Sequence, residues 1–329
     1  MSRSKIFTNA DQLQAHLAGG LIPAVPVPFG NDGRLHGRGH ESYLSYISAQ
    51  PIAGVAVWAH TGRGLMLDDE TARIVLQDWR SALPAKVVIA GAGAKTASDS
   101  QEATAQTIRM AERAIEFGAD ALLVYPPVWL REHPSRDKLI VEHHERLSQL
   151  GLPIILFYLY EAAGGISYTQ SVLDDLLALP QVVGIKMATL DSVITYQDIA
   201  RYLQKQYPEK LLITGEDRFL GYSLRRGARA ALIGLGAVCS DLQAELIRAN
   251  AEGTTDRFLE LSDAVDLLAE ALFINPMEGY IKRLLWALVH LQIIPAAAAN
   301  DPWGPELPPE DFNNIGRVLT ALTAEAHFS

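Results

Sequence analysis

The sequence contains a single cysteine, Cys239, among 329 residues. One thiol can form neither an internal disulfide nor a cysteine-based metal cluster. Long apolar runs are also missing, because residues 152–160 and 230–239 are about ten residues each, against the ~20 that a membrane-spanning helix needs. The N-terminus lacks the continuous apolar segment of a secretory signal. We therefore expect a soluble protein of a reducing compartment, the cytoplasm.

Basic residues are in deficit, with 28 Lys and Arg against 38 Asp and Glu and a net charge of -10. This balance gives no general attraction to a polyanion, so neither nucleic acid nor an anionic membrane surface is expected as a partner. Hydrophobic residues make up 49% of the chain and charged residues 20%. That composition excludes disorder as the main state, because the chain can bury a large core.

Short apolar runs rich in Val, Ile and Leu recur along the chain and are apolar on both faces. Such runs are typical of parallel strands covered by helices. The eight predicted strands are Leu21–Pro28, Ile52–His60, Lys86–Ala92, Ala119–Tyr125, Leu152–Tyr158, Gln181–Lys186, Lys210–Thr214 and Arg229–Gly234.

Segments with helical periodicity separate these runs, and several end at a glycine or before a proline. The predicted helices are Asp68–Ser81, Ala97–Phe117, Ser135–Leu150, Tyr168–Leu179 and Ser192–Gln206. This alternation predicts an α/β fold, a (β/α)8 TIM barrel over residues 1–238, with an open doubly wound sheet as the alternative. Residues 239–329 are predicted to form a C-terminal helical region packed on the barrel, with helices Asp241–Asn250, Asp256–Phe273, Pro276–Leu291 and Glu310–Ala326.

The most informative side chain is Lys186, which follows Val-Val-Gly-Ile at the end of the sixth predicted strand. The carboxyl ends of barrel strands line the active-site mouth. Burial there penalises the ammonium form, so the pKa falls and a neutral amine becomes available for Schiff-base chemistry on a carbonyl. The alternative is a lysine whose stem packs on apolar surface while its amine reaches water.

Two further strand ends could complete such a site. Tyr158 ends the fifth strand, and its phenol could relay protons beside Lys186, although an ordinary interfacial aromatic is the alternative. After the second strand, the turn of His60, Thr61, Gly62, Arg63 and Gly64 could hold a carboxylate through backbone N–H groups and the Thr61 hydroxyl, although it could equally be a plain loop.

The histidines His133, His143 and His144 form only a loose candidate metal cluster. Adjacent residues on a helix point in different directions, so we expect a solvated helix surface and no metal site.

In order along the chain, several segments resemble the dihydrodipicolinate synthase/N-acetylneuraminate lyase family of class I, pyruvate-type aldolases. The resemblance covers roughly Gly20 to Leu319 and rests on the following segments: Leu-Ile-Pro-Ala-Val-Pro-Val-Pro-Phe, Ala-His-Thr-Gly-Arg, Gly-Ala-Asp-Ala-Leu-Leu-Val-Tyr-Pro-Pro-Val-Trp, Phe157-Tyr158 before Gly184-Ile185-Lys186, Thr214-Gly215-Glu216-Asp217 and Asn275-Pro276.

The resemblance implies a homotetramer or homodimer of barrels that uses no cofactor. It implies that Lys186 forms an imine with the keto carbon of pyruvate or another 2-oxo acid and that Tyr158 shuttles protons. It also implies that Thr61, together with the backbone of Thr61 and Gly62, holds the substrate carboxylate. The further substrate-binding residues expected from it are His60, Trp129, Gly215 and Leu232.

The departures from the family pattern are as informative. Ala163 stands where the lysine-pathway synthase has an arginine that binds the second substrate, and His60 replaces the first threonine of a pair. Trp129 replaces a tyrosine, Arg63 an acidic residue, and Met187 a glutamate. We therefore do not expect the lysine-pathway synthase, and we expect a less polar pocket around Trp129, Met187 and Ala163.

Four hypotheses follow. The first is a Schiff-base lyase, an aldolase that forms or cleaves a 2-oxo acid. The second is a 2-keto-3-deoxy sugar acid dehydratase that uses the same imine. The third is a non-catalytic small-molecule-binding barrel, and the fourth a metal-dependent aldolase built on His133, His143 and His144.

Overall fold

A computed structural model describes residues 7, 9–95, 99–190 and 192–325. Eight parallel strands form one sheet in the order β1-β8-β7-β6-β5-β4-β3-β2. Each predicted apolar run overlaps one of them, and β5 and β6 extend one and two residues beyond their predicted ends. The strands are β1 (Leu21–Pro23), β2 (Gly54–Val57), β3 (Val87–Ala92), β4 (Ala121–Val124), β5 (Ile154–Leu159), β6 (Val182–Ala188), β7 (Leu211–Thr214) and β8 (Ala230–Ile233).

The sheet closes on itself between its first two strands. Ala24, just after β1, forms a parallel bridge with Ala56 of β2. The Ala53 N–H donates to the Leu21 carbonyl at 2.9 Å, and the Val25 N–H donates to the Ala56 carbonyl at 3.1 Å. These contacts leave no open edge between β1 and β2. The predicted (β/α)8 barrel is therefore confirmed, and the doubly wound alternative is excluded.

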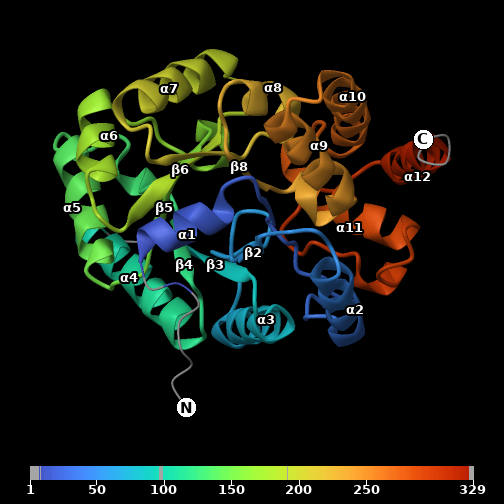
Figure 1. Cartoon of the computed structure of the whole chain (residues 1–329). Helices are drawn as coiled ribbons and strands as arrows, with labels where there is room; N and C mark the ends of the chain where they lie inside the picture. The colour runs from blue at the N-terminus through green and yellow to red at the C-terminus, as the bar shows by residue number, and fades with distance from the viewer. Residues whose placement is uncertain (1–6, 8, 96–98, 191, 326–329) are drawn as a thin grey trace.

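Helices surround the barrel and alternate with its strands (Figure 1). They are α2 (Gly37–Ser48), α3 (Asp69–Ala82), α4 (Ser100–Glu116), α5 (Arg136–Ser148), α6 (Gln170–Leu177), α7 (Val193–Gln206) and α8 (Leu220–Arg225). The predicted start of α4, at Ala97, lies outside the described residues. The helices α2 and α8 were not predicted from the sequence.

A further unpredicted helix, α1 (Ala10–Leu17), lies across the end of the barrel at which the strands begin (Figure 1). Leu13 and Leu17 are fully buried and belong to the same apolar cluster as the inward-facing strand side chains. The His16 ring bonds to the carbonyl of Ala53, just before β2, at 2.9 Å. The helix therefore closes the amino-terminal end and leaves the carboxyl-terminal end as the mouth.

Side chains along each strand alternate between the barrel interior and the surrounding helices, as strand geometry requires. On β5, Ile155, Phe157 and Leu159 belong to the interior cluster. Leu156 and Tyr158 belong to the layer between sheet and helices instead. This alternation decides which side chains of a strand can reach the mouth.

After the barrel, the described residues 239–325 form helices and no strand, in line with the predicted helical region. They are α9 (Ser240–Glu252), α10 (Thr255–Leu272), α11 (Tyr280–His290) and α12 (Pro309–Glu325), which lie together at one side of the barrel (Figure 1). The peptide bond between Asn275 and Pro276 is cis. The division into two domains at residue 238 stays a prediction.

The paired histidines of α5 are buried, so the expected solvated surface is wrong for them. His143 is 2% and His144 0% exposed. His143 hydrogen-bonds the Thr104 hydroxyl at 3.0 Å, and His144 Nδ1 lies 2.8 Å from the Ile140 carbonyl. Their burial lowers the pKa of both imidazoles, to about 4 for His144. Within the described ranges there is no group of three metal-ligating side chains and no helix long and apolar enough to cross a membrane.

Candidate active site

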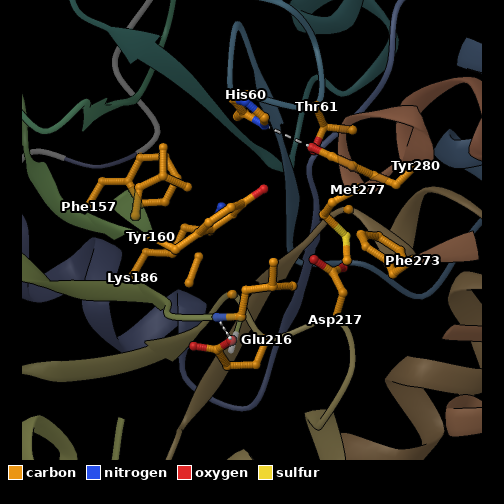
Figure 2. Close-up of a pocket in the computed structure, with 15 residues that line it drawn as sticks. His60, Thr61, Phe157, Tyr160, Lys186, Glu216, Asp217, Phe273, Met277 and Tyr280 are labelled. Carbon is orange, nitrogen blue, oxygen red and sulfur yellow. Dashed lines mark hydrogen bonds between the residues drawn. The ribbon is translucent and has the colours of Figure 1, made fainter. Parts of the chain in front are cut away.

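A pocket opens at the carboxyl ends of the strands, where Lys186 lies (Figure 2). Its cavity measures about 40 Å³. One water needs roughly 10–15 Å³ on the same measure, so the space suits a ligand of a few heavy atoms. The described lining residues are His60, Thr61, Phe157, Leu159, Tyr160, Lys186, Ala188, Leu190, Gly215, Glu216, Asp217, Gly234, Phe273, Met277 and Tyr280.

Lys186 is buried, with 6% of its surface exposed. Its Nζ lies 4.3 Å from the centre of the Phe157 ring, and the two residues are register partners on β6 and β5. Gly215 makes room for the lysine stem, because a Cβ at that position would stand 2.6 Å from Lys186 Cε. No ion pair or hydrogen bond ties Nζ to the described residues. The amine is therefore packed on apolar surface and free to react.

Burial lowers the pKa of Lys186 to about 8, and the nearby Asp217 and Glu216 carboxylates oppose this shift. Desolvation outweighs the attraction because the ammonium loses its hydration inside the barrel. At pH 7 a pKa of about 8 leaves about a tenth of the amine neutral, roughly two to three orders of magnitude more than at the ordinary lysine pKa. A neutral amine in such a pocket can attack a carbonyl carbon.

Two carboxylates, the buried Glu216 and the half-buried Asp217, connect the ends of β6, β7 and β8. Glu216 accepts hydrogen bonds from the Thr189 N–H at 2.6 Å, the Thr189 hydroxyl at 2.9 Å and the Leu190 N–H at 3.0 Å. Asp217 accepts a bond from the Leu235 N–H at 2.6 Å. Burial raises the pKa of Glu216 to about 7 and that of Asp217 to about 6. Both groups therefore hold the backbone beside Lys186 and titrate near neutral pH.

A hydroxyl cluster occupies the wall that includes the end of β2. The Tyr280 hydroxyl lies 3.0 Å from Thr61 Oγ1 and 3.1 Å from His60 Nδ1 (Figure 2). Tyr280 is the first residue of α11, 220 positions away from His60. Burial lowers the pKa of His60, which favours its neutral form. The wall thus offers groups that both donate and accept protons.

Glu278 connects the groups at the rim of the pocket. Its carboxylate accepts bonds from the Tyr160 hydroxyl at 3.3 Å and from Arg63 Nη1 at 3.1 Å, and it lies 3.4 Å from His60 Nε2. Arg63 is also held by Asp301, at 3.1 Å from Nε and 2.6 Å from Nη2. The Arg63 guanidinium is therefore engaged by acidic side chains and does not present a free cation to a ligand.

Arg283, which is fully buried, fixes the segment that carries Met277, Glu278 and Tyr280. Arg283 Nη1 donates to the Ile274 carbonyl at 2.8 Å and to the Pro276 carbonyl at 3.2 Å. Its Nε donates to Asp311 of α12 at 2.8 Å. The C-terminal helices thereby fix the position of one wall of the pocket.

The prediction that Tyr158 brings its phenol to Lys186 is wrong in geometry. Tyr158 is not among the described residues that line the pocket. Its register partner on β6 is Met187, and its ring packs against Tyr168 with centroids 6.2 Å apart. Because side chains alternate along a strand, Phe157 faces the lysine and Tyr158 faces the helices.

Of the other predicted residues, Lys186, Thr61, His60 and Gly215 line the pocket, while three do not. The Gly62 N–H donates to the Ala59 carbonyl at 3.0 Å, so it is not available to a carboxylate. Trp129 packs edge-on against His143, 5.4 Å between centroids. Leu232 is fully buried among the interior strand side chains.

The expected apolar surroundings also have a different origin. Met187 is fully buried on the helix-facing side of β6, and neither it, Trp129 nor Ala163 is among the described lining residues. The apolar wall comes instead from Phe157, Leu159, Phe273 and Met277. The prediction of a less polar pocket around Trp129, Met187 and Ala163 is therefore wrong in its residues, and the described lining combines this apolar wall with polar and ionisable side chains.

Sequence reasoning missed the contributions of Tyr160, Phe273, Met277 and Tyr280. Tyr160 lies directly after β5, where a strand-end search could have found it. The other three belong to the C-terminal region, whose helical pattern gives no signal of contact with the barrel mouth. Only the neighbouring Asn275-Pro276 pair marked this segment, through the resemblance.

The model of the Dihydrodipicolinate synthetase family matches residues 17–305. A 4-hydroxy-tetrahydrodipicolinate synthase from Methanosphaerula palustris is 27% identical over 269 residues, covering 81% of this chain and 88% of that protein. An uncharacterized DapA-like lyase from Chloroflexus aurantiacus is 26% identical over 222 residues, covering 66% and 70%.

Solved structures show the same fold. The dihydrodipicolinate synthase of Thermotoga maritima superimposes with a TM-score of 0.81 at 19% identity, covering 94% of this chain and 99% of that one. The sialic acid aldolase of Ruminococcus gnavus gives 0.79 at 18% identity, covering 94% and 98%. With a family match across most of its length, this chain belongs to the dihydrodipicolinate synthetase family and is a lyase of the class I aldolase type.

Proposed function

We propose that the chain is a Schiff-base lyase in which Lys186 forms an imine with the keto carbon of pyruvate or a short 2-oxo acid. The imine withdraws electrons from the neighbouring carbon, so that a carbon–carbon bond can be made or broken there. The observation that carries this proposal is a buried lysine of lowered pKa, beside an aromatic ring, in a small pocket at the barrel mouth.

We propose that Thr61 binds the substrate carboxylate. Its backbone N–H has no hydrogen-bond acceptor among the described residues, and its hydroxyl lines the pocket. A carboxylate held there would direct the keto carbon of a 2-oxo acid into the pocket that contains Lys186.

The second substrate is expected to be neutral or weakly charged near the reacting carbon. Among the described residues that line the pocket there is no arginine, and Arg63 at the rim is bound by Asp301 and Glu278. A second carboxylate would meet apolar walls and acidic side chains. This argues against the lysine-pathway synthase and favours an aldehyde or a small apolar partner.

The direct test is trapping of the imine. Incubation with pyruvate and borohydride should add the mass of reduced pyruvate to Lys186, as located by peptide mass spectrometry. Lys186→Ala should abolish both trapping and turnover while the protein stays folded, and Lys205→Ala, on the outer helix α7, is the matched control. Label on another lysine, or no label on the folded wild type, would overturn the proposal.

The dehydratase would form the same imine as the aldolase, but it would expel water from the substrate instead of an aldehyde. Release of pyruvate from 2-keto-3-deoxy acids supports the aldolase, whereas a semialdehyde that keeps all carbons supports the dehydratase. A non-catalytic binding barrel predicts ligand binding without turnover of any 2-oxo acid. Activity that survives a chelator excludes the metal-dependent aldolase.

A further inference from the structure

The imine chemistry needs a proton donor and acceptor beside Lys186, and the barrel strand next to the lysine supplies none. Phe157 stands opposite Lys186 on β5, with its ring 4.3 Å from Nζ. A phenyl ring can stabilise a cation through its face, but it carries no exchangeable proton. Tyr158 points to the helix layer instead. Both oxygens of Glu216 already accept hydrogen bonds from Thr189 and Leu190, and Asp217 accepts one from the Leu235 N–H, so we look to another element for the proton donor.

Two phenols line the pocket, Tyr160 and Tyr280, and their surroundings differ. The Tyr160 hydroxyl donates to Glu278, a rim carboxylate whose side chain is 38% exposed. The Tyr280 hydroxyl lies inside the pocket wall, on a residue that is 7% exposed, between Thr61 Oγ1 and His60 Nδ1. Only Tyr280 combines burial with a direct contact to an imidazole.

Resting on the proposed Schiff-base function, we propose that Tyr280, supplied by the C-terminal helix α11, is the proton-transfer residue of this site, with His60 and Glu278 as its positioning residues. Figure 2 shows the phenol directed at His60 on the wall of the pocket that contains Lys186. His60 in turn lies 3.4 Å from Glu278 through Nε2. A carboxylate at one ring nitrogen holds the imidazole so that the other can face the phenol.

The proton steps balance without any further reactant. Attack by the neutral Lys186 amine forms the C–N bond, and the amine proton moves to the former carbonyl oxygen, giving a carbinolamine. The C–O bond then breaks as the nitrogen lone pair forms C=N, and the leaving hydroxyl takes the Tyr280 proton and departs as water. The resulting phenolate removes a proton from C3 of the iminium, which yields the enamine and restores the phenol.

Each species in this sequence has a stabilising neighbour in the structure. The Thr61 hydroxyl is placed to donate a hydrogen bond to the phenolate oxygen, and Nδ1 of neutral His60 accepts the phenol proton's hydrogen bond in the resting site. The iminium nitrogen occupies the place of Nζ above the Phe157 ring, where a positive charge is favoured. Burial raises the pKa of the Tyr280 phenol, so the resting site holds it protonated and ready to donate.

The experiment compares Tyr280→Phe with two matched variants, Tyr160→Phe and Tyr158→Phe, each of which removes one hydroxyl. The measurements are the rate of imine formation under borohydride trapping and the exchange of the pyruvate C3 protons with deuterium, followed by NMR. We expect Tyr280→Phe to lower both rates about a hundredfold or more, the usual scale for loss of a proton-transfer group. KM for pyruvate should change little. Tyr158→Phe, outside the described pocket lining, should stay within a few-fold of the wild type, and Tyr160→Phe should lose much less of both rates than Tyr280→Phe.

A Tyr280→Phe rate within a few-fold of the wild type, or the large loss appearing in Tyr160→Phe or Tyr158→Phe, would overturn the assignment. A wild-type protein that pyruvate and borohydride leave unlabelled at Lys186 would instead overturn the proposed function. If Tyr280→Phe does not fold, as judged by its thermal unfolding, His60→Asn provides the second test. It should slow C3 exchange and flatten its dependence on pH, whereas unchanged exchange with an unchanged pH profile would contradict the proposal.

Discussion

The two ends of the barrel enclose the same parallel sheet but bury opposite kinds of side chain. The amino-terminal end is closed by α1 through Leu13 and Leu17, which are fully buried on apolar strand residues. The carboxyl-terminal end buries Lys186 and Glu216, with the half-buried Asp217 beside them. Burial of apolar surface stabilises the fold, whereas burial of ionisable groups costs stability and moves their pKa values. The apolar burial at the amino-terminal end therefore offsets the loss of stability caused by burying ionisable groups at the carboxyl-terminal end.

The largest expected effect is on stability, at the apolar end. Leu13→Ala should lower the free energy of unfolding by about 2–5 kcal/mol, because it removes buried methyl groups and leaves a cavity under α1. Chemical denaturation measures this change. Turnover per folded molecule should stay at the wild-type value, since α1 lies at the end of the barrel away from Lys186.

Ala15→Gln, on the exposed face of the same helix, is the control and should change stability by no more than about 0.5 kcal/mol. Should Leu13→Ala change turnover as strongly as stability, the two ends would not be independent.

The next effect is on activity, at the reactive end. Gly215→Ala places a Cβ 2.6 Å from Lys186 Cε and 2.8 Å from the Met187 carbonyl, so the lysine stem must move. Misplacement of a reacting group by about 1 Å can cost on the order of a hundredfold in rate. We expect kcat/KM to fall at least tenfold, as steady-state kinetics would measure. Gly37→Ala, where nothing lies within 4 Å, should leave the kinetics unchanged.

The last effect is a dependence of activity on pH. Because burial lowers the pKa of Lys186 to about 8, the reactive neutral amine increases as pH rises through that value. We expect kcat/KM to rise about tenfold per pH unit below 8 and to level off above it. A rise that continues toward pH 10 would mean that the amine is not desolvated in solution.

Asp217→Asn sharpens this measurement. Its carboxylate raises the pKa of Lys186 against the larger opposing effect of burial, so its removal should move the midpoint to lower pH. A midpoint that stays in place would show that Asp217 does not act on the amine.

The fold and the lysine could be predicted because both leave a local signal. Runs that are apolar on both faces indicate buried parallel strands, and a lysine after such a run stands out at the barrel mouth. Which alternate side chains of a strand face the barrel interior leaves no such signal when both faces are apolar. In Leu-Pro-Ile-Ile-Leu-Phe-Tyr-Leu-Tyr both faces are apolar, so the sequence does not show that Phe157 rather than Tyr158 faces inward. The register also shifts between Ile154 and Ile155.

Tyr280 could not be predicted for a different reason. It meets His60 across 220 positions of sequence, and the helical periodicity of α11 only indicates that one face is buried. Which part of the barrel that face touches depends on Arg283 and its bonds to the Ile274 and Pro276 carbonyls. Such long-range packing is a property of the folded chain and has no local pattern.

The dependence of one pocket wall on α11 has a consequence for synthesis of the protein. All eight strands leave the ribosome before Tyr280 does, so a complete barrel can form while the lysine still faces water across an unfinished rim. The pocket wall that contains Phe273, Met277 and Tyr280 is added only when the last helices dock. We therefore expect a prematurely released chain to have an incomplete pocket around its lysine.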